Sequence, residues 1–171
     1  MRLEYANCLG KAMKIIIRGR NNKVTRREVN LASKWMCRFL LGEDSKPLKI
    51  KIVFRIPENR KECGSVYFPR SHYRFPKSFF IDINPRLSRR MQLITLAHEL
   101  VHVKQYVLGE LRDTKYEKWV RWKNKKIAFF NSAGFTYKNA PWEIEAHGKE
   151  YKIYRKYCDY LIENNIIFRK S

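Results

Sequence analysis

Alternation of apolar and polar residues predicts the strands of this chain. In residues 48–56 every second position is apolar, and lysine or arginine occupies most positions between them. A period of two is typical of a strand with one buried face. Shorter apolar runs predict two more strands, over residues 64–73 and 78–83. Pro47 precedes the first strand, and Asn84 and Pro85 end the last, as expected of residues that disfavour continued pairing.

Helical spacing of apolar residues predicts three helices. An amphipathic helix over residues 29–41 ends at Gly42. A second helix follows Ser88, a residue suited to capping, and runs to Gly109, which favours the backbone conformation of a helix end. It is apolar on almost every side, so we expect it to be central and buried. A third helix is predicted over residues 141–161, with proline in its first turn.

The order of a helix, several strands and two further helices predicts an α+β fold in which a small mixed sheet packs on the two later helices. A length of 171 residues suits a single domain. Within it we expect a basic N-terminal segment over residues 1–30, a core over 31–164 and a tail over 165–171. Weaker alternation over residues 122–128 indicates an edge strand or hairpin.

Charge and cysteine content indicate the partners and the compartment. Lysine and arginine number 37 against 16 aspartates and glutamates, a formal net charge of +21, so the surface attracts polyanions. Cys8, Cys37, Cys63 and Cys158 form no CxxC pair, and we expect free thiols. The first apolar run is too short for a signal peptide, and we expect no membrane span. We therefore predict a cytoplasmic location, in the host if a phage encodes the chain.

The central helix carries a metal-binding pattern. Residues 98–102 are HELVH, which fits HExxH. Residues four apart share a helix face, so the imidazoles of His98 and His102 can bind one cation, for which we expect Zn²⁺. Glu99 would then lie where a carboxylate can act as catalytic base on a water molecule. Burying these groups is costly unless a ligand or a polar partner satisfies them, so a metal-free polar cluster is the alternative.

A third zinc ligand is expected at the start of the last helix. Glu143 and His147 are four residues apart and share a face, whereas Glu145 is rotated by about 200° from Glu143. We therefore predict Glu143 as the third metal ligand, with Glu145 and His147 as alternatives. If Glu143 is the ligand, His147 is a candidate to support the metal site or to contact a developing oxyanion. The acids could also simply complement the positive end of the helix.

A family resemblance follows from these motifs. The strand FIDINP at residues 80–85, the segment TLAHELVHVKQYV at 95–107 and WEIEA at 142–146 resemble the zincin metallopeptidases, in particular SprT-like and related phage-encoded peptidases. The resemblance covers about residues 48–160. It implies a minigluzincin-type core, zinc held by the two histidines of HExxH and an edge strand that can bind an extended peptide. The glutamate helix is similar to that of ImmA-like and thermolysin-like peptidases. Spartan-type SprT enzymes carry a third histidine soon after HExxH, which this chain lacks.

A basic segment with aromatic residues follows the central helix. Tryptophans interleaved with cations suit unpaired bases, so we predict non-specific nucleic-acid binding there. An equal alternative is that the tryptophans pack on the core and the lysines are solvated. The candidate residues are Lys115, Lys118, Arg121, Trp122, Lys123, Lys125 and Lys126.

The function expected from these features is a zinc-dependent metallopeptidase that acts on a protein or peptide substrate, and proteins associated with nucleic acid are the candidate substrates. One alternative is a catalytically idle zincin scaffold that serves as a basic nucleic-acid-binding or virion-associated protein. A second alternative is an ImmA-like regulatory peptidase that cuts a single repressor. Oligomeric state does not follow from the sequence.

Overall fold

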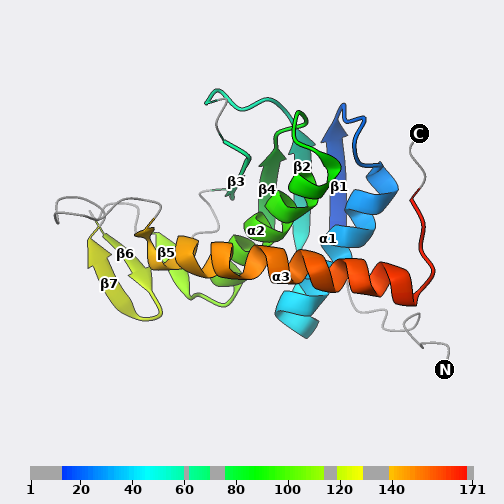
Figure 1. The fold of residues 1–171 in the computed structure, drawn as a ribbon. Coiled ribbons are helices and arrows are strands. Elements are labelled where there is room, and N and C mark those ends of the chain that lie inside the picture. The colour runs from blue at the N-terminus through cyan, green and yellow to red at the C-terminus, as the bar shows by residue number, and fades with distance from the viewer. Residues whose placement is uncertain (1–12, 60–61, 70–75, 114–118, 129–138, 169–171) are drawn as a thin grey trace.

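The computed structural model describes residues 13–59, 62–69, 76–113, 119–128 and 139–168. These residues form an α+β fold with two sheets, as the order of elements predicted (Figure 1). The elements are β1 (Lys14–Gly19), α1 (Arg26–Leu41), η1 (Gly42–Ser45), β2 (Lys49–Phe54), β3 (Gly64–Tyr67), β4 (Ser78–Ile83), α2 (Arg89–Val107), β5 (Leu111–Asp113), β6 (Trp119–Trp122), β7 (Lys125–Ala128) and α3 (Pro141–Glu163).

The larger sheet is mixed, as predicted. Its strand order is β1-β2-β4-β3. Strands β1, β2 and β4 are parallel, and β3 pairs with β4 in the antiparallel direction at one edge. The predicted strand over 78–83 coincides with β4, while β2 and β3 are shorter than the segments 48–56 and 64–73 that the pattern indicated.

The N-terminal basic segment is not separate from the core. Residues of β1 pair with β2 along its whole length, from Lys14 opposite Lys49 to Gly19 opposite Phe54. Val24 and Val29 are buried in the main core. The boundary at residue 31 was therefore wrong for the described part of 1–30. At the other end, Ile166 and Phe168 of the expected tail also pack against this core.

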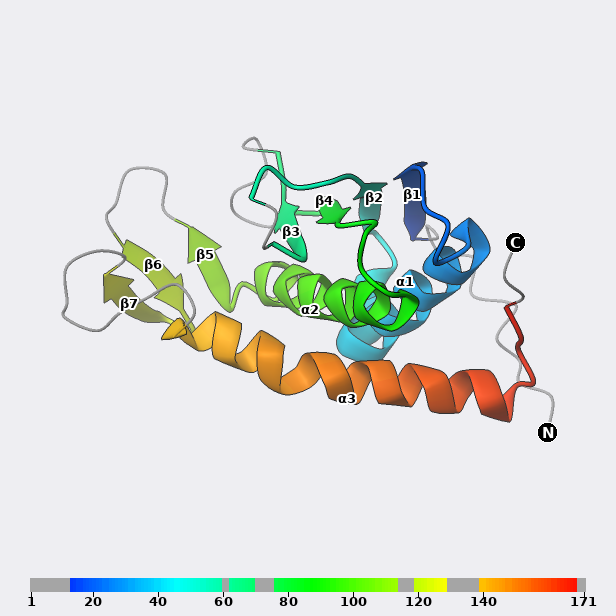
Figure 2. The same cartoon turned by 45° about the horizontal axis from the view of Figure 1, so that its top comes forward.

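Helix α2 lies between the sheet and α3, which explains its apolar character on every side. Figure 2 shows the sheet above α2 and α3 below it, with α1 beside α2. Leu93, Leu96 and Leu100 of α2 are almost fully buried in the main core. The predicted ends are confirmed: the side chain of Ser88 accepts a hydrogen bond from the Met91 amide, and Gly109 has a φ of 68° just after the helix.

A second, three-stranded antiparallel sheet follows α2, with the order β5-β6-β7. The β6–β7 hairpin turns at Lys123 and Asn124, both with positive φ, as two-residue hairpins require. The sequence indicated a hairpin here but not β5. A small hydrophobic cluster fixes this sheet to the start of α3 and consists of Leu111, Val120, Trp122, Ala140 and Trp142.

Two further expectations from the sequence were that the cysteines are free thiols and that no helix spans a membrane. Cys37, Cys63 and Cys158 are free thiols, as predicted, and Cys8 lies outside the described residues. Among the helices that the structure describes, none combines the length and the apolar character needed to cross a bilayer.

Candidate metal centre

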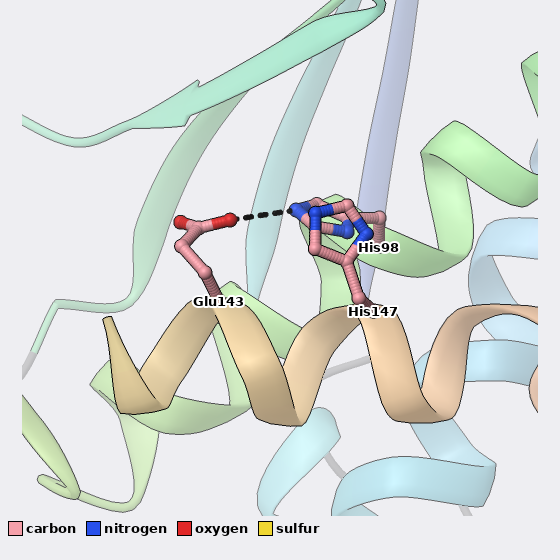
Figure 3. Close-up of side chains that lie close together, drawn as sticks. All are labelled: His98, Glu143 and His147. Carbon is pink, nitrogen blue, oxygen red and sulfur yellow. Dashed lines mark ion pairs between the residues drawn. The ribbon is translucent and has the colours of Figure 1, made fainter. Parts of the chain in front are cut away.

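The side chains of three residues converge where α2 packs against the first turns of α3. The Nε2 atoms of His98 and His102 are 3.1 Å apart. The Glu143 carboxylate places Oε2 3.3 Å from Nε2 of His98 and Oε1 3.2 Å from Nε2 of His102. Figure 3 shows Glu143 extending from α3 toward His98. The two helices thus bring together the three residues that the sequence predicted as metal ligands.

Local sequence explains why these side chains converge. His98 and His102 lie one turn apart on α2, so their rings project from the same face. Glu143 lies in the first turn of α3, which begins at Pro141, and the buried ring of Trp142 next to it packs near Trp122. The side chains of His98, His102 and Glu143 are only 13%, 7% and 5% exposed. Water therefore has little access to the donor atoms.

The separations of the donor atoms fit a tetrahedral metal ion. Zinc bonds to nitrogen and oxygen ligands are about 2.0–2.1 Å long, which places two tetrahedral ligand atoms about 3.3–3.4 Å apart. The two Nε2 atoms are 3.1 Å apart, and each lies 3.2–3.3 Å from a different oxygen of the Glu143 carboxylate. Two imidazoles and one carboxylate are also a donor set that zinc uses in catalytic sites. His98, His102 and Glu143 would therefore hold zinc without rearrangement of the helices.

Gln105 fixes the tautomer of His102. The amide nitrogen of Gln105 donates to the Trp142 carbonyl and to the Glu145 carboxylate, each at 3.0 Å. Its amide oxygen must then be the atom that faces Nδ1 of His102, at 2.8 Å, and Nδ1 carries the proton. In the neutral form of His102 the lone pair then lies on Nε2, the nitrogen that is close to His98 and Glu143. This is the form of histidine that binds a metal.

Glu150 has the same role for His98. Nδ1 of His98 lies 2.7 Å from the Glu150 carboxylate, which accepts a hydrogen bond from the Nδ1–H group. Burial lowers the pKa of His98, but the hydrogen bonds to Glu143 and Glu150 outweigh it and raise the pKa to about 10. In the metal-free chain His98 is therefore a cation at neutral pH. Zinc would have to displace its Nε2 proton, which makes binding stronger at higher pH.

Glu145 faces away from the two histidines. It contacts Lys104 at 3.4 Å and Lys149 at 2.6 Å, and it accepts a hydrogen bond from Gln105. Burial raises the pKa of Glu145, but the hydrogen bonds from Lys149 and Gln105 and the charge of Lys104 lower it to about 2. Glu145 is therefore ionised at neutral pH and fixes the position of the Gln105 side chain through a hydrogen bond. It does not contribute an oxygen to the cluster of His98, His102 and Glu143.

His147 lies at the open side of the site. Its ring centroid is 4.6 Å from that of His98, and Nδ1 is 3.3 Å from the Glu150 carboxylate. One donor atom each from His98, Glu143 and His147 lies within 4.8 Å of the others, so this trio is a looser alternative set. We favour the set with His102, because its atoms are closer together and more buried, whereas the side chain of His147 is 60% exposed.

Glu99 is buried between α2 and the edge strand β3. A Cβ added to Gly64 would lie 3.2 Å from Oε1 of Glu99 and 2.6 Å from a methyl carbon of Thr95. Glycine thus lets the β3 backbone approach the carboxylate closely. Burial raises the pKa of Glu99 to about 7, although the neighbouring histidines oppose the shift. A metal ion held by those histidines would add to their effect and so lower the pKa of Glu99.

The described residues of the predicted nucleic-acid site lie on the β6–β7 hairpin. Lys115 and Lys118 lie outside the described residues. Arg121, Lys123, Lys125 and Lys126 are exposed on the hairpin, but Trp122 is only 8% exposed. Its ring packs near Trp142, and the Lys123 ammonium lies 4.8 Å from the ring centroid. Trp122 therefore matches the alternative stated with that prediction, in which the tryptophan packs on the core, and nucleic-acid binding by the hairpin stays a prediction.

Gln105 and Glu150 are the site residues that sequence reasoning missed. Their spacing carried a signal, since Gln105 follows His102 by three residues and Glu150 follows Glu143 by seven, so each shares a face with a predicted ligand. Histidine ligands usually donate their second nitrogen to such a partner.

Replacing Gln105 by leucine is expected to weaken zinc binding. The change removes the acceptor for Nδ1 of His102, and loss of such a partner typically costs about 10- to 100-fold in metal affinity. Gln92→Leu is a matched control, because Gln92 is an equally buried glutamine of α2 whose side chain bonds Asn21 and loop carbonyls instead. Zinc competition with a chromophoric chelator measures both variants. Equal affinities in the two would contradict the role of Gln105.

Comparison of the chain with protein-family models, with curated proteins and with solved structures found no match. The chemistry of the metal centre is therefore inferred from its own residues.

Proposed function

We propose that this chain is a zinc-dependent metallopeptidase with a zincin-like core. The observation that carries the proposal is the buried cluster of His98, His102 and Glu143, in which the two Nε2 atoms lie 3.1 Å apart and each lies 3.2–3.3 Å from one oxygen of the Glu143 carboxylate. A metal-free cluster of hydrogen bonds would show similar separations, so the proposal also uses the donor set, two imidazoles and one carboxylate, which zinc uses in catalytic sites. The resemblance of the HExxH and WEIEA segments to zincins supports the same chemistry.

Each residue of the proposed site has a distinct role. His98, His102 and Glu143 would hold zinc, and Gln105 and Glu150 orient the two imidazoles. Bound zinc would supply Lewis acidity, which polarises a peptide carbonyl and lowers the pKa of water. Glu99 accepts the proton of the attacking water and passes it to the leaving amine. His147, exposed beside His98, is the candidate to donate a hydrogen bond to the developing oxyanion.

The edge strand β3 is the proposed binding site for the peptide. It is the outer strand of the sheet on the side of the metal centre, and an extended peptide can add to such an edge through main-chain hydrogen bonds. Because Gly64 has no side chain, the backbone of this strand can lie close to the Glu99 carboxylate. A peptide paired with β3 would therefore pass close to the proposed base, and its recognition would depend little on its sequence.

The proposal is tested by the metal dependence of cleavage. Purified full-length chain should contain about one zinc per chain by elemental analysis. It should also cleave peptides in a digested-proteome mixture, with new amino termini identified by mass spectrometry. A chelator should abolish cleavage, and added zinc should restore it. A broad peptide mixture also detects a narrow, ImmA-like specificity that casein would miss.

Two results would contradict the proposed function. Cleavage that persists after complete removal of metal would exclude the zinc mechanism. Absence of both bound zinc and zinc affinity would favour the metal-free alternative, in which a protonated His98 pairs with Glu143 and Glu150 only to stabilise the core.

A further inference from the structure

The larger sheet has one face that no described helix covers. Helices α1, α2 and α3 all lie on the same side of it (Figure 2). Side chains on the covered face are almost fully buried, among them Ile50, Ile52, Phe79 and Ile81. Successive residues of a strand point to opposite faces, so the intervening residues form the other side, which we call the open face.

An aromatic pair lies on the open face, at the β3 side. The strand register places Ile16, Lys51, Phe80 and Tyr67 in one row across the four strands. The rings of Tyr67 and Phe80 are stacked, with centroids 5.2 Å apart and an interplanar angle of 8°. The Lys51 ammonium lies 5.7 Å from the centroid of Phe80. Tyr67 is 42% exposed, so one flat aromatic surface is available to a partner.

The open face is strongly cationic. All the lysines and arginines within the four strands lie on it, at Lys14, Arg18, Lys49 and Lys51. The strands contain a single acidic residue, Asp82, which is buried and paired with Arg55. Positive charge on this face is therefore not balanced by carboxylates of the same strands.

Protection of the sheet edges does not account for this charge. Lysine on an edge strand prevents pairing with other chains, but Lys49 and Lys51 belong to β2, which lies inside the sheet between β1 and β4. Their ammonium groups cannot block an edge. The ring of Tyr67 near them is 42% exposed, although it belongs to an aromatic pair with the half-buried Phe80. Both features are accounted for by a partner that carries phosphates and flat rings.

We propose that the open face binds single-stranded nucleic acid. The backbone phosphates would contact the lysines and arginine of β1 and β2, and an unpaired base would stack on Tyr67. Duplex DNA or RNA is a poorer fit, because its base faces are already stacked and cannot reach a ring on a flat sheet. This surface is distinct from the hairpin predicted from sequence, and it does not depend on the metal centre.

Fluorescence anisotropy with a labelled 20-nucleotide oligo(dT) tests the proposal on the full chain across salt concentrations. Lys49→Gln/Lys51→Gln should lower the slope of log affinity against log salt by about 1.4, since each phosphate contact to a single strand contributes about 0.7. Lys152→Gln/Lys156→Gln is the matched control, because it removes two exposed charges from α3 on the helical side. That variant should keep the slope.

A second pair of variants separates stacking from charge. Tyr67→Leu keeps an apolar side chain but removes the flat ring, and it should weaken binding about tenfold with little change in the salt slope. Tyr67→Phe keeps the ring and should bind like the unmodified chain. Thermal melting verifies that the variants fold.

Three results would overturn the proposal. Equal slopes in the two double variants would indicate general attraction to a basic protein. Tyr67→Leu binding within twofold of the unmodified chain would exclude base stacking. Tighter binding to a 20-base-pair duplex than to oligo(dT) would exclude preference for a single strand.

Discussion

Replacing Glu99 by glutamine is expected to lower kcat for peptide cleavage by about 10²- to 10⁴-fold, the usual contribution of a general base. Glutamine has nearly the same shape but cannot accept the proton of the attacking water. Zinc content should not change, because Glu99 is not one of the three converging residues. Cleavage rate and zinc per chain, measured on the same preparation, distinguish loss of the base from loss of the metal.

Glu28→Gln is a suitable control for this change. Glu28 is also a buried glutamate, 1% exposed, but it lies on α1 and pairs with Arg89. Its replacement should reduce stability while leaving the cleavage rate of the folded fraction unchanged. Full turnover by the Glu99→Gln variant with bound zinc would refute the assignment of the catalytic base.

Local spacing predicted much of the metal centre. The HExxH motif places two imidazoles on one helix face whatever surrounds the helix, and the four-residue spacing of Glu143 and His147 does the same on α3. The sequence therefore identified the residues that converge. The sequence favoured Glu143 as the carboxylate that faces the histidines but left Glu145 and His147 as alternatives, because the choice depends on the angle at which α3 crosses α2. The cations around Glu145 come from α2, the hairpin and α3 together.

Strand β1 could not be predicted with the same ease. Its apolar run is only Ile15 to Ile17, between Lys14 and Arg18, and such a pattern resembles a basic surface segment. The strand is stabilised by parallel pairing with β2, a partner that lies beyond α1 in the chain. Pairing at that distance leaves no local trace in the sequence. Trp122 was ambiguous for a related reason, because its burial depends on Trp142 of α3.

Glu143→Ala is expected to weaken zinc binding by about 10²- to 10³-fold. Apparent free energies of zinc binding of about 10–16 kcal/mol are shared among four ligands, so one ligand accounts for about 2.5–4 kcal/mol. The remaining imidazoles of His98 and His102 would still hold a metal weakly. Loss of zinc also removes the stability that a bound ligand gives the folded state, so the zinc-induced rise in Tm should become small.

The neighbouring carboxylate supplies the control that decides between the ligands considered from sequence. Glu145→Ala removes a carboxylate from the same turns of α3, but that group contacts Lys104, Lys149 and Gln105. Its effect on zinc should be smaller than that of Glu143→Ala, because it acts only through Gln105. His147→Ala should retain zinc, since its ring lies outside the buried cluster of His98, His102 and Glu143. If either variant loses zinc while Glu143→Ala keeps it, the third ligand is not Glu143.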